Sequence, residues 1–204
     1  MKVYGAENVP KSGPVLIAPI HVSHLDPPLV GCACPRAINF MAKEELFKKK
    51  FFSWLITSLG AFPVKRGETD SAAIRLAIDI LKAGKTTLVF PEGTRGDGIQ
   101  MGEVKVGIAM LAKRSGAAVV PVGLSGSNKM LPRGESRPRR AKLKVVFGEP
   151  LYFADFEEGN ARDARELFTA ELITRLHKVA EEAGTVLQPA LSESQTSPRP
   201  QPVP

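Results

Sequence analysis

Short apolar runs recur along the chain at intervals that predict the strands of a β-sheet. Several of these runs lack strict alternation of apolar and polar residues, which is typical of strands covered on both faces. Helical patterns fill the intervals, and strands that alternate with helices predict an α/β fold. We therefore expect a single-domain layered fold with a mixed, mostly parallel central sheet flanked by helices. The predicted strands are Val15–Ala18, Ala37–Met41, Ala61–Val64, Thr86–Phe90, Ala117–Gly123 and Lys142–Phe147.

The predicted helices carry apolar side chains at helical spacing and have recognisable ends. Asp70 is the expected N-cap of a helix that presents Ile74 and Leu81 on one face and ends at Gly84. Pro27 suits the first position of another helix, which Asp26 would cap. The remaining predicted helices are Glu44–Leu59, Gly102–Arg114, which closes near Gly116, and Asp163–Ala183.

The chain has 204 residues, enough for one domain with a substantial core. We expect residues 1–184 to form that domain. Residues 185–204 are rich in Pro, Ser and Gln. Such a segment has too little apolar surface to offset the entropy of ordering, so it is predicted to be disordered.

Composition and charge leave several classes of partner open. The chain is 43% hydrophobic and 24% charged, with a net charge of +7 and a pI of about 9.5. A basic surface suits nucleic acid, anionic lipid or phosphorylated ligands, and charge alone does not choose among them. The N-terminus has no apolar segment typical of a signal peptide, and no apolar run approaches the roughly 20 residues of a membrane-spanning helix.

The two cysteines, Cys32 and Cys34, are separated by one residue, too close for a favourable mutual disulfide. A reducing compartment is therefore expected. A metal site that combines them with His21, His24 and Asp26 is a weak hypothesis, because zinc ligands usually show wider paired spacings.

The first candidate for chemistry is the run Ile20–Pro28, where a predicted strand gives way to a predicted helix. Four residues separate His21 from Asp26, and one of them is His24. Neutral imidazole is the commonest general base near pH 7, and a carboxylate on its second nitrogen fixes the tautomer. The residues alone leave two questions open: whether Asp26 merely caps a helix, and whether His24 is the base instead.

The second candidate is Phe90-Pro91-Glu92-Gly93-Thr94-Arg95-Gly96, which follows a predicted strand. Ligands of open α/β sheets bind at the carboxyl ends of strands. Gly93 permits a tight turn, Thr94 and Arg95 offer a hydroxyl and a guanidinium to an anion, and Glu92 can hold the arginine or accept from a substrate hydroxyl. Without its place at a strand end, the block would be read first as an ordinary turn.

Two further blocks follow strand patterns. Gly60–Gly67 delivers the basic pair Lys65 and Arg66, which could bind an anion or simply lie in solvent. Val120–Gly123 contains an internal proline, which suggests a bend or an edge strand and a role in shape rather than chemistry.

Taken in order, these four blocks resemble the glycerolipid acyltransferase family, the lysophosphatidate acyltransferases of phospholipid synthesis. That family carries a His-x4-Asp block, a Gly-containing block ending in Arg, a Phe-Pro-Glu-Gly-Thr-Arg block and a Val-Pro block. The corresponding segments here are His21–Asp26, Gly60–Arg66, Phe90–Arg95 and Val120–Gly123. The similarity covers roughly Gly5 to Pro150, so residues 1–184 are expected to be an acyltransferase domain.

The resemblance implies roles for individual residues. His21 matches the family's catalytic base and Asp26 its carboxylate, whereas His24 falls on a variable position. The residues implied to bind the phosphate-bearing substrate are Arg66, Glu92, Gly93, Thr94, Arg95 and Lys105. Ile20 departs from the family, which usually has Asn before the histidine.

Family members often carry an N-terminal hydrophobic segment for membrane docking, and few residues here precede the first predicted strand. Lys48–Ile56 combines basic and aromatic residues that suit an anionic lipid interface. Alternatively, Phe51, Trp54 and Leu55 pack in the core. Lys129–Lys144 is a second basic stretch, suited to lipid head groups, coenzyme A phosphates or an acidic carrier protein. Alternatively, it is an ordinary solvated loop.

The expected activity is acyl transfer from acyl-CoA or acyl carrier protein to the sn-2 hydroxyl of lysophosphatidic acid, on the cytoplasmic face of a membrane. The chain has no Gly-x-Ser-x-Gly motif, and both cysteines lie in an apolar run. Direct attack is therefore expected rather than an acyl-enzyme, with no cofactor, no metal and no nucleic-acid partner. Alternatives are glycerol 3-phosphate or a lyso-aminolipid as acceptor, a non-enzymatic basic binding module, and a metal-dependent hydrolase.

Overall fold

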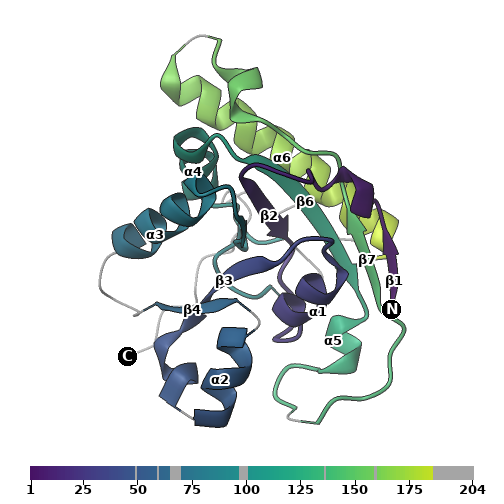
Figure 1. Ribbon diagram of the computed structural model, residues 1–204. Helices are drawn as coiled ribbons and strands as arrows, with labels where there is room; N and C mark the ends of the chain where they lie inside the picture. The colour runs from purple at the N-terminus through teal and green to yellow at the C-terminus, as the bar shows by residue number, and fades with distance from the viewer. Residues whose placement is uncertain are drawn as a thin grey trace, which may run out of the picture.

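The fold is built on a twisted sheet with helices on both faces (Figure 1). The computed structural model describes residues 1–48, 50–58, 60–64, 70–96, 101–135, 137–158 and 160–185. Within these residues the sheet has seven strands in the order β1-β7-β6-β2-β5-β3-β4. The strands are β1 (Lys2–Tyr4), β2 (Val15–Pro19), β3 (Ile38–Lys43), β4 (Ala61–Val64), β5 (Thr86–Leu88), β6 (Ala118–Ser125) and β7 (Lys144–Phe147).

Strand direction confirms the predicted mixed, mostly parallel α/β sheet. Neighbouring strands are parallel except β6 and β7, which pair antiparallel. The parallel strands from β6 to β4 therefore end at one edge of the sheet, which we call the carboxyl edge. Ligands of such sheets bind at that edge.

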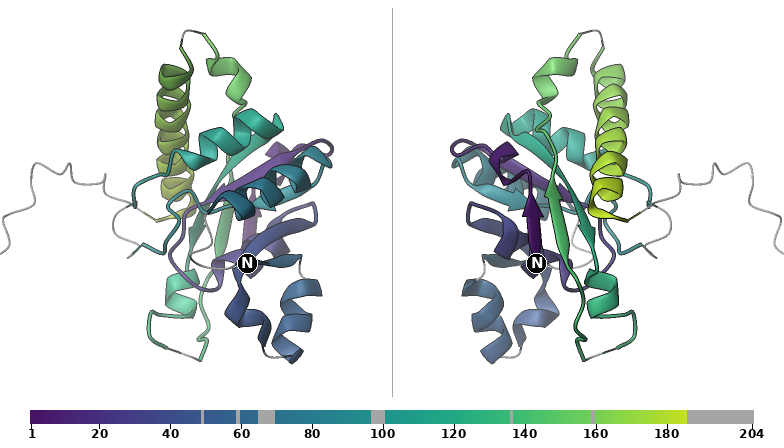
Figure 2. Two further views of the ribbon diagram at one scale, coloured as in Figure 1. Left: turned by 90° about the vertical axis from the view of Figure 1, so that its left-hand side faces the viewer. Right: turned by 90° about the vertical axis from the view of Figure 1, so that its right-hand side faces the viewer.

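Helices cover both faces of the sheet (Figures 1 and 2). Helix α6 packs on β6 and β7, α4 contacts α6, and α3 contacts α4 and β5. Helix α1 lies on the face of the sheet opposite to α3 and α4. The connection from β2 through α1 to β3 runs toward β4, whereas the connections through α3 and α4 run toward β1, and right-handed crossovers in opposite directions place their helices on opposite faces. The helices are α1 (Asp26–Ala33), α2 (Lys50–Ser58), α3 (Asp70–Lys82), α4 (Gly107–Ser115), α5 (Ser127–Met130) and α6 (Ala161–Ala183), with 3₁₀ helices η1 (Ala6–Asn8), η2 (Glu44–Lys48) and η3 (Phe153–Phe156).

The core includes all of β2, the five residues of which are buried. It lies between β5 and β6 and pairs with both in parallel. Helix α6 approaches β6 so closely that a Cβ on Gly123 would lie 2.0 Å from the carbonyl oxygen of Val179. A glycine is therefore required there, and α6 packs directly on the strand next to β2.

The predicted strands are all present, with shifts of a few residues at their ends. Strand β1 was missed because its three residues are exposed and carry no apolar pattern. The suggestion that Pro121 marks an edge strand is wrong, since β6 lies between β2 and β7. Pro121 is tolerated because it precedes the first pair of the β6–β7 ladder, Val122 with Phe147.

Two predicted helices differ from the observed ones by more than two residues or in continuity. The helix expected over Gly102–Arg114 begins only at Gly107, because the backbone N–H groups of Gly102 and Lys105 bind Glu92 and Pro91 instead of forming a helical turn. The helix expected over Glu44–Leu59 is divided into η2 and α2, and Leu59 lies outside the described residues. The same is true of residues 186–204, the predicted disordered tail.

None of the helices within the described part of the chain combines the length and the apolar character needed to span a bilayer.

Candidate active site

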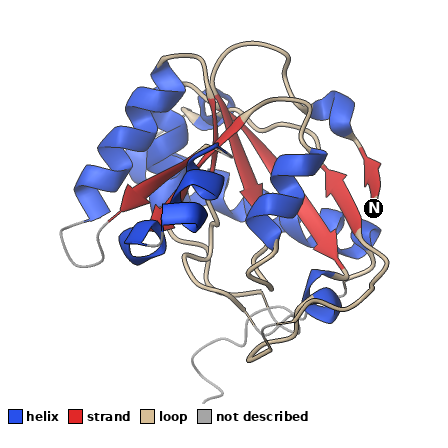
Figure 3. Ribbon diagram, turned by 60° about the horizontal axis from the view of Figure 1, so that its bottom comes forward, coloured by secondary structure: helices blue, strands red, loops and turns tan. Residues whose placement is uncertain are grey.

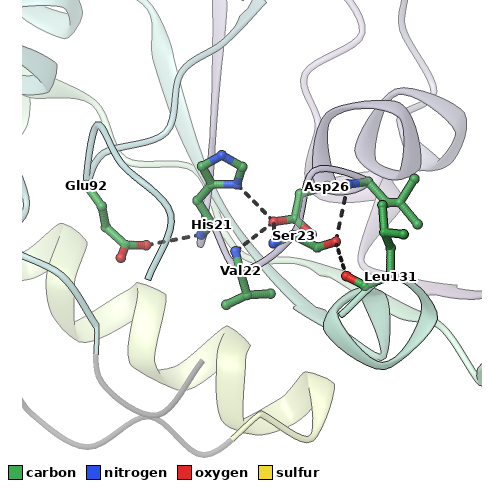
Figure 4. Close-up of polar contacts among 7 residues, drawn as sticks. His21, Val22, Ser23, Asp26, Glu92 and Leu131 are labelled. Carbon is green, nitrogen blue, oxygen red and sulfur yellow. Dashed lines mark hydrogen bonds and ion pairs between the residues drawn. The ribbon is translucent and has the colours of Figure 1, made fainter. Parts of the chain in front are cut away.

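His21 and Asp26 lie at the carboxyl edge, between the end of β2 and the start of α1. The Nδ1 atom of His21 lies 2.9 Å from Oδ2 of Asp26 (Figure 4). Asp26 is fully buried, and the His21 side chain is 15% exposed. A carboxylate can only accept, so Nδ1 carries the proton and Nε2 is left as the basic nitrogen. Nε2 points away from Asp26 in Figure 4.

The Asp26 carboxylate is held by the backbone that precedes it. Oδ2 also accepts hydrogen bonds from the N–H groups of Val22 and Ser23, each at 2.7 Å. The expectation that Asp26 is the N-cap of its helix is wrong: α1 begins at Asp26, and its N-cap is Leu25, which makes no side-chain cap. The carboxylate points back toward His21 because it binds these two backbone N–H groups rather than the N–H groups at the start of α1.

Phe90 and Glu92 fix His21 from the neighbouring strand end. The Phe90 ring stacks on the imidazole with centroids 3.7 Å apart and planes at 19°. The backbone N–H of His21 donates to Oε1 of Glu92 at 3.1 Å, and its carbonyl accepts from the Gly96 N–H at 2.8 Å. The loop 92–96 is therefore attached at both ends to the backbone of His21.

Glu92 also connects His21 to the segment that precedes α4. Its second oxygen, Oε2, accepts the N–H of Gly102 at 2.9 Å. A Cβ on Gly102 would lie 2.8 Å from that oxygen, so a larger residue there would displace the Glu92 carboxylate. Glu92 is 6% exposed, and both oxygens bind backbone. Glu92 thus holds the backbone of His21 and Gly102, and each of its oxygens keeps a second acceptor lone pair.

Burial gives Glu92 a pH signature. It raises the pKa of Glu92 above its ordinary value of 4.5, although the N–H groups of Gly102 and His21 oppose the shift. A carboxyl whose pKa is higher in the folded than in the unfolded chain loses stabilising free energy as pH rises between the two values. We expect the free energy of unfolding of the wild type to fall relative to Glu92→Gln as pH rises from below 4.5. Urea unfolding of both proteins at a series of pH values tests this. A rise in the free energy of unfolding of the wild type relative to Glu92→Gln over the same pH range would contradict it.

Most residues predicted to bind an anion lie on or beside the loop attached to His21. Gly93 adopts φ of +70°, Thr94 is exposed, and Arg95 is half-buried next to Gly96. A Cβ on Gly93 would lie 4.0 Å from Cγ of Lys105, so the lysine stem lies over the loop. The Nζ atom of Lys105 forms an exposed ion pair with Glu103 at 2.6 Å. Arg66 lies outside the described residues.

Several contributors to the site were missed in the sequence. Phe90 stands in the quoted block, but nothing in the sequence indicates that its ring would lie on His21. Ser23 was also missed: its Oγ donates to the carbonyl of Leu131 at 3.4 Å, which links the His21 turn to the end of α5. These contacts join residues far apart in the sequence, and only the fold shows them.

The other candidates from the sequence have different surroundings. His24 is exposed. Cys32 is exposed and Cys34 half-buried, both as free thiols, and burial raises the pKa of Cys34. Within the described residues, no three His, Cys, Asp or Glu side chains are grouped so that they could hold a metal ion.

Comparison with known proteins identifies the family of the chain. A family model described as Acyltransferase matches residues 1–125. The 1-acyl-sn-glycerol-3-phosphate acyltransferase of Bacillus subtilis (strain 168) is 31% identical over 180 residues, which is 88% of this chain and 87% of that protein. The chain belongs to the acyltransferase family, and the resemblance seen in the sequence is confirmed.

Two further similarities concern structure and acceptor. The crystal structure of the 1-acyl-sn-glycerophosphate (LPA) acyltransferase PlsC from Thermotoga maritima has a TM-score of 0.73 and 31% identity, and the match covers 89% of this chain and 71% of that one. The lyso-ornithine lipid O-acyltransferase of Pseudomonas aeruginosa is 33% identical over 125 residues, 60% of this chain and 47% of that protein. The protein is an O-acyltransferase with the expected α/β fold.

Proposed function

We propose that the protein transfers a fatty acyl group from a thioester to the free sn-2 hydroxyl of lysophosphatidic acid, which gives phosphatidic acid for phospholipid synthesis. The observation that carries the proposal is the pair of His21 Nδ1 and the buried Asp26 Oδ2, 2.9 Å apart, with the loop 92–96 attached to the same histidine. The similarity to acyltransferases named for 1-acyl-sn-glycerol 3-phosphate supports this acceptor.

The reaction follows from the orientation of His21. Nε2 takes the proton of the sn-2 hydroxyl as its oxygen attacks the thioester carbonyl carbon. Asp26 stabilises the imidazolium that forms, through the Nδ1–H. The tetrahedral intermediate collapses, the C–S bond breaks, and the imidazolium returns the proton to the leaving thiolate. The products are phosphatidic acid and a free thiol.

Binding of the phosphate places the hydroxyl beside Nε2. Arg95 and Thr94 come from the loop whose ends bind the His21 backbone, so a phosphate held there is fixed relative to the base. Lys105 reaches the same loop and would exchange its ion pair with Glu103 for the phosphate. Arg66 and Gly93 complete the proposed phosphate site. Positioning of this kind contributes several kcal/mol to catalysis.

The donor is acyl-CoA or acyl carrier protein, both of which present the same thioester. Because the acceptor is a membrane lipid, the proposed location is peripheral, at the cytoplasmic face of a membrane.

The phosphate site is tested with a panel of acceptors. Purified wild type is expected to acylate lysophosphatidic acid in preference to monoacylglycerol, which lacks the phosphate. Arg95→Gln is expected to raise the KM for lysophosphatidic acid by about 10- to 100-fold, the typical effect of a lost charge-assisted hydrogen bond. Arg114→Gln, at the exposed end of α4, is the matched control. Equal use of both acceptors by the wild type would contradict the proposal.

The Pseudomonas relative supplies a reason to include lyso-ornithine lipid in the panel. That acceptor also presents a free hydroxyl but carries no phosphate. If it is preferred over lysophosphatidic acid and Arg95→Gln leaves its KM unchanged, the second acceptor is the substrate.

A further inference from the structure

Helix α2 presents an exposed indole beside a cation. Trp54 is 66% exposed, so the alternative that it packs in the core is wrong. It lines an open hollow of about 510 Å³ together with Phe47, Lys50, Ser53 and Thr57. Two aromatic rings, an exposed ammonium and two hydroxyls thus meet at one surface, and this mixture is typical of a contact with lipid head groups and the first carbons of their chains.

The loop from α5 to β7 is strongly basic. Its exposed cations include Arg133, Arg137 and Arg140, none of which has an acidic partner at ion-pair distance among the described residues. The one carboxylate of this loop, Glu135, pairs with Arg139 at 2.7 Å. The loop therefore carries uncompensated positive charge, which would attract an anionic surface.

Helix α2, which carries the hollow, and the basic loop after α5 lie at the same end of the molecule. Helix α2 follows η2 at the carboxyl end of β3, and α5 follows the carboxyl end of β6. In Figures 1 and 2 both project beyond the sheet at that end, and Figure 3 brings the same end forward. His21 lies at this edge as well, and Ser23 contacts Leu131 at the start of the loop. The two features thus flank the candidate active site.

We propose that this end of the protein docks on the surface of an anionic bilayer. The docking face consists of Trp54, Lys50, Arg133, Arg137 and Arg140. In the docked state Trp54 enters the interface, the four cations contact lipid phosphates, and the carboxyl edge of the sheet faces the membrane. The inference rests on the proposed function in one respect, because a lipid acceptor has to reach His21 from the bilayer.

The exposed indole favours a bilayer over an acidic carrier protein as the occupant. Charge complementarity alone would suit either partner. Trp is enriched where a membrane meets water, and Lys and Arg near such a surface bind anionic head groups. A bilayer would contact both flanks of the site at once, since both project from one end.

Trp54 reports its own environment, because it is the only tryptophan of the chain. Its fluorescence is measured with vesicles of equal parts phosphatidylglycerol and phosphatidylcholine, in the absence of any substrate. We expect a blue shift, and quenching when the lipids carry bromine on their acyl chains. Emission that is unchanged by the vesicles and equally quenched by iodide with or without them would overturn the proposal.

The basic loop is tested by a triple variant, Arg133→Gln, Arg137→Gln and Arg140→Gln. Each basic residue near an anionic surface contributes a comparable increment to binding, so three of them together are expected to change vesicle partition by about a hundred-fold. With vesicles of phosphatidylcholine alone, the wild type and the triple variant are both expected to bind weakly and to the same extent. Unchanged partition of the triple variant into anionic vesicles would overturn the proposal.

The matched control removes equal charge from the opposite end. Lys11, Lys82 and Lys85 are exposed and precede the amino ends of β2 and β5. Their replacement by glutamine is expected to change partition by less than about ten-fold through net charge alone. If both triple variants bind equally weakly, the loop is not the docking element and the proposal fails.

Activity in detergent micelles separates this proposal from the proposed function. The arginine variant should acylate micellar lysophosphatidic acid at the wild-type rate, which also shows that it is folded. If wild type binds vesicles as expected but acylates no lysolipid in micelles, the proposed function fails while the docking face stands. If the arginine variant binds vesicles normally and loses activity only with acyl carrier protein as donor, the loop docks the carrier and the membrane proposal is overturned.

Discussion

Replacement of His21 by alanine is expected to lower the kcat for acyl transfer by about 10²- to 10⁴-fold, the usual contribution of a positioned general base. Nε2 is the basic nitrogen of a ring that Asp26 and Phe90 hold in one orientation. Without it, water has to accept the hydroxyl proton. The KM for lysophosphatidic acid should change little, because the side chains proposed to hold the phosphate lie on a different segment.

His24→Ala is the matched control for this variant. His24 lies three residues from His21 and is exposed, and its removal is expected to leave kcat within about two-fold of the wild type, as for most surface changes. Circular dichroism and thermal unfolding establish that both variants are folded. A large loss in His24→Ala together with near-normal activity in His21→Ala would transfer the role of base to His24.

Replacement of Asp26 by asparagine is expected to lower kcat on the order of 10³-fold while the fold is retained. The amide oxygen can occupy the position of Oδ2 and still accept from the N–H groups of Val22 and Ser23. It carries no charge, so it stabilises the imidazolium poorly. The amide nitrogen would occupy the position of Oδ1, which is buried and makes no hydrogen bond to the described residues. This adds about 1–3 kcal/mol of destabilisation.

Asp26→Ala separates the electrostatic from the structural contribution. It removes the acceptor for both backbone N–H groups as well as the charge, so it should unfold at a lower temperature than Asp26→Asn. If Asp26→Asn retains wild-type kcat, the carboxylate acts only as a structural acceptor for the turn, and its assignment to the catalytic pair is wrong.

Much of the sheet could be predicted because its strands are buried on both faces. Val15–Pro19 and Ala118–Ser125 read as continuous apolar runs, and their positions set the carboxyl edge. The order of the four sequence blocks then indicated which strand ends carry chemistry. Strand β1 was not predicted because its three exposed residues show no apolar pattern. It forms a strand through its pairing with β7.

The detailed contacts of the site could not be predicted, because they depend on tertiary geometry. The sequence matches Glu92 to a substrate-binding position, and only the fold shows that its oxygens bind the backbone of His21 and Gly102. The same contact delays the start of α4 beyond the predicted Gly102. The sequence around Asp26 is typical of a helix N-cap. Only the fold shows that two backbone N–H groups of the preceding turn bind its carboxylate and orient it toward His21.

The most direct test of the central claim follows a labelled acyl chain through a single turnover. Wild type is mixed with a labelled thioester and lysophosphatidic acid, and the label is traced to lipid or to protein after denaturation. The account predicts labelled phosphatidic acid, no label covalently bound to the protein, and almost no labelled lipid with folded His21→Ala. Label on the protein, or no labelled phosphatidic acid from the wild type, would contradict it.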